Sequence, residues 1–304
     1  MKLFSTLAVL VAAASSTVAQ RPNATSICDY YTTALLNVSN ATTQYTLLTL
    51  LVNTAVIGNY TMPNKNAVPG ILNPNGTYNG TAVNLVPYFS GALNSTNRNG
   101  APTSVNFLDG GGAKPLMSNM PANGNTTNQF ALLTHLYSYF GAALGCSNYS
   151  QMGFPAYAGQ ASMYSVHKYM GLDSNEVGYF ITQVGLAASS FGVTAADVTA
   201  VGTLLEGIFD VKCAAAMTVI PAQGPQLQSI CTAADCAMAK NASCSDYGTV
   251  PGEPANATGT ATQSGASSTA TGSSGGSSGG AMKGAVMAAS GVLAGVAAFA
   301  AVLL

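Results

Sequence analysis

The stretch Tyr157-Ala-Gly-Gln-Ala-Ser-Met-Tyr-Ser-Val-His167 leads directly into Lys-Tyr-Met-Gly-Leu-Asp173-Ser-Asn-Glu176. The apolar spacing within Met163–Met170 predicts a short helix, and this helix carries His167. Asp173, followed three residues later by Glu176, has the pattern of a capping box and predicts the start of another helix. An imidazole on such a helix is able to ligate iron. The alternative for His167 is an ordinary core histidine whose polar atoms are satisfied.

Two longer helices are predicted after this stretch. Glu176–Phe191 and Ala195–Asp210 are each preceded by a capping residue, Asp173 and Thr194 respectively. Gly192 lies between them and is the kind of residue that ends a helix. The chain therefore favours a pair of helices joined by a short turn.

A strong helical pattern also covers Gln129–Gly145. Leu132, His135, Leu136 and Tyr139 recur at the spacing i, i+3, i+4 and i+7, which places them on one helical face. His135 is therefore either a ligand that faces the same site as His167 or a polar residue at a helix surface. Two further segments, Ile27–Val38 and Tyr45–Ile57, are also predicted to be helical. Tyr45–Ile57 has apolar residues on all sides and is therefore expected to be buried.

The segments Tyr60–Ala82 and Gly91–Asn128 are rich in Asn, Gly and Pro, and we interpret them as exposed loops. Several of the chain's glycosylation sequences lie in this region, which agrees with surface exposure. The eleven Asn-x-Ser/Thr acceptors are Asn23, Asn37, Asn40, Asn59, Asn75, Asn79, Asn94, Asn125, Asn148, Asn241 and Asn256.

Both ends of the chain have the composition of processed segments. Residues 1–19 have the charge, the apolar run and the small residues of a secretory signal peptide. Residues 251–280 are rich in Ser, Thr and Gly and are expected to form a stalk. Residues 281–304 end in an uncharged apolar tail, which predicts a glycosylphosphatidylinositol (GPI) attachment signal rather than a retained membrane helix. The remaining part, 21–250, is long enough to bury a single core.

Six cysteines in a secreted chain are expected to form disulfides, and six cysteines allow 15 connectivities. The spacing does not match a zinc site, because the chain has no Cys-x-x-Cys and no histidine near the C-terminal cysteines. We expect the group from Cys213 to Cys244 to form at least one bridge that holds the C-terminal segment on the helices.

Charged residues make up 6% of the chain and the formal net charge is −1. This balance argues against nucleic acid as a partner, because such binding depends on clustered positive charge. The sequence has no Ser-His-Asp order with a Gly-x-Ser-x-Gly elbow of the kind that carries a serine nucleophile. Enzyme signatures are therefore scarce.

The order of these segments resembles the truncated haemoglobin family, in which a short helix carries the proximal histidine and two long helices follow. The resemblance runs over 129–212, with two further islands at 45–59 and 85–91. Phe140-Gly-Ala-Ala-Leu-Gly145 is similar to the end of the family's distal helix, and Leu85-Val-Pro-Tyr88-Phe89-Ser-Gly91 to its aromatic pair. The chain departs from the family in its long insertions, in one extra residue between Tyr157 and Met163, and in having Val52 at the place of the distal tyrosine.

The resemblance implies an all-α, globin-like domain with long loop insertions that binds haem. His167 would be the proximal iron ligand and His135 a candidate second axial ligand. Tyr88, Phe89 and Leu136 would contact the porphyrin. We therefore expect a GPI-anchored protein at the plasma membrane or cell wall, with the membrane and cell-wall polysaccharide as partners. It would serve in haem capture, redox sensing or the handling of small ligands.

Two other functions stay open on the sequence alone. The protein is then either a surface glycoprotein that keeps the helical scaffold without haem, or a secreted enzyme with its active site in the long insertions.

Overall fold

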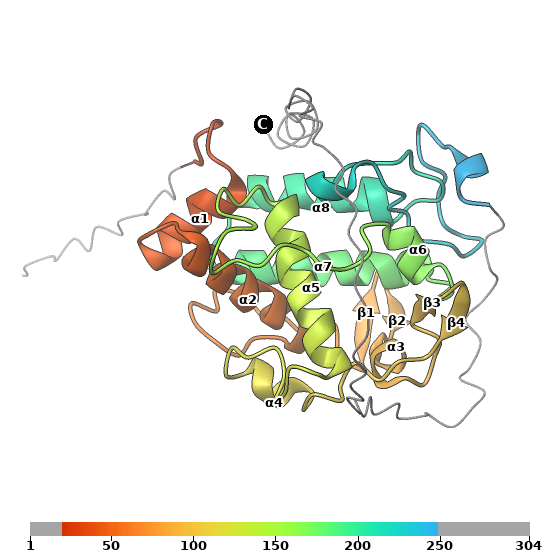
Figure 1. Cartoon of the computed structure of the whole chain (residues 1–304), viewed down its shortest axis with the longest axis horizontal. Coiled ribbons are helices and arrows are strands. Elements are labelled where there is room, and N and C mark those ends of the chain that lie inside the picture. The colour runs from red at the N-terminus through yellow and green to blue at the C-terminus, as the bar shows by residue number, and fades with distance from the viewer. Residues whose placement is uncertain (1–19, 249–304) are drawn as a thin grey trace, which may run out of the picture.

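The computed structural model describes residues 20–248. The predicted signal peptide, stalk and anchor signal, and the last two residues of the predicted domain, lie outside the described residues. Within them the chain is rich in helix and has two small sheets (Figure 1). The α-helices are α1 (Ile27–Leu36), α2 (Ala41–Ile57), α3 (Val86–Ser90), α4 (Ala113–Leu116), α5 (Asn128–Ala143), α6 (Met163–His167), α7 (Ser174–Ser190) and α8 (Ala195–Phe209). The strands are β1 (Gly76–Tyr78), β2 (Thr81–Val83), β3 (Thr96–Arg98) and β4 (Ala101–Thr103).

The long helices pack around α2. It contacts α1, α5 and α7, while α7 also packs against α8. Figure 1 shows α5 crossing α7 and α8 running alongside α7. The hydroxyl of Tyr137 on α5 donates to Oδ1 of Asn53 on α2 at 2.6 Å, and both side chains are fully buried. Because a buried polar group without a partner costs more than the bond contributes, this pair fixes the position of α5 on α2.

The predicted helix starts are confirmed by their caps. Asp173 and Glu176 form both hydrogen bonds of the capping box at the start of α7, and Thr194 accepts from the Asp197 N–H at the start of α8. Helix α2 begins earlier than predicted, at Ala41, because Asn40 caps it. The side chain of Asn40 accepts from the Thr43 N–H at 3.0 Å.

The all-α expectation was wrong in the two segments interpreted as loops. Each contains an antiparallel hairpin: β1 pairs with β2, and β3 with β4. Both hairpins turn at an Asn-Gly pair with positive φ, namely Asn79-Gly80 and Asn99-Gly100. Such pairs are the residues that a two-residue hairpin turn requires, so the sequence held a signal for both hairpins.

The same two segments also contribute to the protein interior, which corrects the interpretation that they are exposed loop alone. Val68, Ile71, Val105, Leu116 and Ala122 are all buried. The segments therefore cover part of the helical core and help to close it.

The three disulfides confirm that all six cysteines are paired. The bond Cys28–Cys146 joins α1 to the segment after α5, and the other two bonds, Cys213–Cys244 and Cys231–Cys236, lie in the C-terminal segment. Disulfides of this number are typical of a secreted protein. In the described part of the chain no helix is long and apolar enough to cross a membrane.

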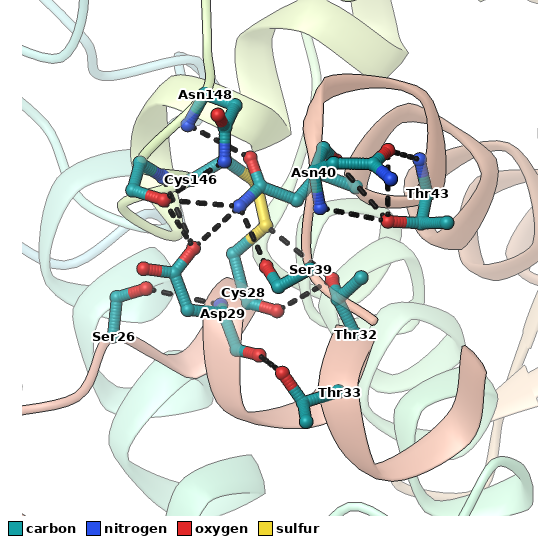
Figure 2. Close-up of a disulfide and its surroundings, with 12 residues drawn as sticks. Ser26, Cys28, Asp29, Thr32, Thr33, Ser39, Asn40, Thr43, Cys146 and Asn148 are labelled. Carbon is teal, nitrogen blue, oxygen red and sulfur yellow. Dashed lines mark hydrogen bonds between the residues drawn. A yellow bond between two sulfur atoms is a disulfide. The ribbon is translucent and has the colours of Figure 1, made fainter. Parts of the chain in front are cut away.

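Hydrogen bonds surround the Cys28–Cys146 disulfide (Figure 2). The carboxylate of Asp29 accepts from the side-chain amide of Gln44 at 2.6 Å and from the Ser147 N–H at 3.1 Å. The carbonyl oxygen of the Gln44 side chain accepts from the Asn148 N–H at 2.9 Å. These bonds join α1, α2 and the chain after α5 at one end of the molecule.

The C-terminal segment wraps back on the helices, as predicted. The hydroxyl of Tyr164 on α6 donates to the Tyr247 carbonyl at 2.7 Å, and the Thr232 N–H donates to the Leu172 carbonyl at 2.9 Å. The Ile230 and Cys231 N–H groups both donate to the Phe209 carbonyl at the end of α8. The segment therefore contacts α6, the chain just before α7 and the end of α8.

The disulfide Cys28–Cys146 spans 118 residues, whereas Cys231–Cys236 spans 5. Because a longer closed loop restricts the unfolded chain more, we expect the Cys28→Ser/Cys146→Ser variant to lose about 5 kcal/mol of unfolding free energy. The Cys231→Ser/Cys236→Ser control should lose about 2 kcal/mol. Denaturant unfolding of the two variants measures the difference, and equal losses would contradict the expectation.

Candidate functional site

A cavity of about 410 Å³ lies between α3, β3, α5, α6 and α7, and Ile230 of the C-terminal segment closes part of it. Its volume falls in the range of about 300–1,000 Å³ that is typical of small-molecule sites. All five residues that the sequence analysis assigned to a cofactor site line this cavity: His167, His135, Tyr88, Phe89 and Leu136. Residues that are far apart in the sequence are therefore brought to one place.

The predicted face of α5 forms one wall of the cavity. Leu132, His135, Leu136 and Tyr139 all line it. The opposite face of the helix, which includes Tyr137, packs on α2. The position of α5 on α2 therefore decides which face is left for the cavity.

His167 is held in one tautomer by its own helix. Its Nδ1 lies 2.7 Å from the carbonyl oxygen of Met163, one turn earlier in α6. Because a carbonyl oxygen can only accept, Nδ1 carries the proton and Nε2 keeps its lone pair. Burial lowers the pKa of His167, while the bond to Met163 acts in the opposite direction. The ring is thus held neutral and able to ligate a metal through Nε2.

His135 lines the cavity from α5 and is surrounded by the loop before α6. Its ring centroid lies 5.4 Å from that of Tyr157, and a Cβ placed on Gly159 would lie 3.0 Å from its Nδ1. Burial lowers the pKa of His135. No hydrogen bond to its imidazole is found among residues 20–248, so one ring nitrogen can offer its lone pair to a ligand and the other its N–H.

Sequence reasoning missed several residues of the cavity. Tyr157 lines it and donates from its hydroxyl to the Gln160 carbonyl at 2.9 Å, and burial raises its pKa to about 12. Thr96 and Asn97 on β3 also line it. Tyr157 lies in the same stretch of sequence as His167, so it could have been assigned to the site from the sequence. Thr96 and Asn97 could not, because β3 lies in a segment that was interpreted as loop.

The cavity wall is mainly apolar. Glu176 contributes a carboxylate, which also accepts from the Asp173 N–H at 3.2 Å in the capping box of α7. None of the described residues that line the cavity is a lysine or an arginine. A ligand inside the cavity must therefore be largely apolar. Any negatively charged group of that ligand must lie outside the cavity, where it is not in contact with this wall.

A second, smaller cavity of about 80 Å³ is lined mainly by apolar residues of α1, α2, α5, α7 and α8. Val52, which the resemblance placed where the family has its distal tyrosine, lines this smaller cavity and not the larger one. Leu136 and Phe140 line both.

Asp210, directly after the cavity residue Phe209, lies among other carboxylates. The Ser174 hydroxyl donates to its Oδ1 at 2.9 Å. Burial, helped by the charges of Glu206, Asp235 and Asp173, raises the pKa of Asp210 to about 6, although the bond from Ser174 opposes this. The end of α8 is thus sensitive to mild acid.

Among the described residues no group of three or more His, Cys, Asp or Glu side chains could hold a metal ion. No protein-family model matches the chain, and no curated protein or solved structure shows significant similarity to it. The geometry of the cavity is therefore the basis for assigning a function.

We expect Asp210→Asn to stabilise the protein at neutral pH. The pKa of Asp210 is raised in the folded state, so its protonated carboxyl group favours folding. This contribution to the free energy of unfolding is complete below the pKa that the group has in the unfolded chain, and it is lost as the pH rises through about 6. The gain at pH 7.5 should be about 1 kcal/mol, below the full linkage value because the carboxyl group is half exposed.

The test is thermal or denaturant unfolding of wild type and Asp210→Asn at pH 4 and pH 7.5. Asp246→Asn is a control at an exposed carboxylate. A stabilisation that is the same at both pH values would contradict this cause.

Proposed function

We propose that the cavity binds haem in a globin-like domain of the truncated haemoglobin type, with His167 as the proximal ligand. The observation that supports this most is the bond from Nδ1 of His167 to the Met163 carbonyl, 2.7 Å long, which leaves Nε2 for iron. An imidazole oriented in this way by a second-shell acceptor is the usual arrangement of a histidine ligand. The presence of His135 in the same cavity agrees with the proposal.

The residues present fit a porphyrin. Tyr88, Phe89 and Leu136 supply apolar and aromatic wall, and the volume suits a cofactor of this class. The carboxylates of haem would have to lie at the edge of the cavity, because no basic residue lines it. Arg98 directly follows the lining residue Asn97, and Lys168 directly follows His167. Bound haem would supply an iron that exchanges electrons or binds a small ligand.

His135 distinguishes two versions of this function. If its imidazole takes the second axial position, a small ligand reaches the site only after His135 moves away, and electron exchange or haem capture is favoured. If it does not, the site is open on that side. Tyr157 and Gly159 pack on His135 and hold it neutral beside the cavity, because burial lowers its pKa.

The deciding experiment is titration of the purified ectodomain with ferric haem. We expect a defined Soret band for the wild type and a loss of at least about tenfold in affinity for His167→Ala, since a metal ligand is removed. Gln160→Ala, a change in the same wall without a ligand, is the matched control. Folding of each variant is checked by circular dichroism.

The His135→Ala variant completes the experiment. Two axial imidazoles would give a six-coordinate, low-spin ferric spectrum in the wild type, and His135→Ala should convert it to a five-coordinate or water-bound one. A wild-type ectodomain that stays colourless with haem would contradict the proposal. The alternative of a surface glycoprotein without haem would then stand, with exposed acceptors such as Asn75 and Asn125.

We further propose that the protein is carried on the cell surface by a GPI anchor, at the plasma membrane or transferred to wall polysaccharide. The support is the composition of residues 251–304, a Ser/Thr/Gly-rich segment followed by an uncharged apolar tail. The disulfides agree with secretion.

Phosphatidylinositol-specific phospholipase should release the protein from membranes, and a chain truncated before Ser273 should be secreted freely. The measurement is the distribution between membrane and medium before and after the enzyme. Surface protein that still contains residues 285–304 by mass spectrometry would show instead that the tail is retained.

A further inference from the structure

Helix α6, which carries His167, is too short to be stable by itself. It has five residues, whereas isolated helices need more than about 12 residues to be even marginally stable in water. The last carbonyl groups of any helix also lack partners within the helix. The position of His167 therefore depends on groups outside α6.

Most of the α6 carbonyls with a partner are bonded locally. The Met163 carbonyl accepts from the His167 side chain, and the Tyr164 carbonyl accepts from the Lys168 N–H at 2.9 Å. The Ser165 carbonyl differs. It accepts from Nδ2 of Asn97 on β3 at 2.8 Å, a residue 68 positions earlier in the chain.

Both ends of the Asn97 amide are fixed. Nδ2 donates to the Ser165 carbonyl, and Oδ1 accepts from the Gly100 N–H at 2.9 Å, in the turn between β3 and β4. The hydroxyl of Tyr169, just after α6, donates to the Gly100 carbonyl. The β3–β4 hairpin thus contacts the chain on both sides of His167.

The other side of α6 rests on the C-terminal segment. The Tyr164 N–H and the Ser162 hydroxyl both donate to the Leu227 carbonyl, at 3.2 and 3.1 Å. That segment is cross-linked by Cys213–Cys244, whereas β3, β4 and the turn between them contain no cysteine. Of the two supports of α6, the hairpin is held by side-chain hydrogen bonds, from Asn97 and from Tyr169, so a substitution of Asn97 weakens this support without breaking a disulfide.

We propose that Asn97 is a positioning residue of the haem site: through the Ser165 carbonyl it holds α6 where Nε2 of His167 meets the cavity. This rests on the proposed haem binding. Thr96 and Asn97 are also part of the cavity wall, so release of the hairpin loosens both the proximal helix and one side of the cavity. The segment interpreted from the sequence as an exposed loop then sets how long haem stays bound.

The test compares Asn97→Asp, which keeps the size but removes the donor, with a matched control. In the control, Asn66→Asp, the lost bonds are from Nδ2 to the Leu186 carbonyl of α7 at 3.1 Å and to the Ala67 carbonyl at 3.2 Å, both outside the cavity. Asn97→Ala is the second variant should the aspartate prevent folding. Two quantities are measured: amide hydrogen exchange of the haem-free proteins, and transfer of haem from the loaded proteins to excess apomyoglobin.

We expect faster exchange within residues 163–170 in Asn97→Asp but not in Asn66→Asp. Haem release should be about fivefold to tenfold faster, the size expected for the loss of one hydrogen bond. Wild-type release and exchange in both Asn97 variants would overturn the proposal. Faster haem release without faster amide exchange in residues 163–170 would also overturn the proposal. Asn97 would then act on haem directly, as part of the cavity wall, and not through α6. A wild type that takes up no haem would overturn the proposed function, and this inference with it.

Discussion

The buried hydrogen bond between Tyr137 and Asn53 fixes how α5 lies on α2, the helix around which the other long helices pack. It joins α5 to α2 at 2.6 Å, and Nδ2 of Asn53 donates in turn to the Leu116 carbonyl at 3.1 Å. Any shift of α5 along α2 would leave these polar groups buried without partners, which is more costly than the bond itself is favourable. With α5 fixed, its other face, with His135 and Leu136, can only face the cavity.

A second constraint acts on α6. A helix of five residues has little stability of its own, and it lies between the β3–β4 hairpin and the disulfide-linked C-terminal segment. Within it, the bond from His167 to Met163 decides the tautomer of the imidazole. The chemistry of the cavity thus depends on segments outside the main helices, and this gives the long insertions a structural purpose.

The main helices were predictable from the sequence because their signals are local. The capping pairs at Asp173 and Thr194 and the apolar spacing of α5 gave three helices to within two residues of the observed bounds. The two hairpins were missed. Their Asn-Gly turns were visible, but strands of three residues carry too little alternation to be recognised, and glycosylation sequences favoured exposed loop.

The sequence by itself determined which residues could form a site: two histidines on predicted helices, an aromatic pair, and an even set of cysteines. All five named site residues do line one cavity. Only the tertiary structure decided that they meet, how the six cysteines pair, and that Asn97 reaches α6. The physical reason is the distance along the sequence over which each kind of interaction acts. Helix caps and helical periodicity act over a few residues, whereas the cavity depends on contacts between segments tens of residues apart, whose geometry is settled only when the core packs.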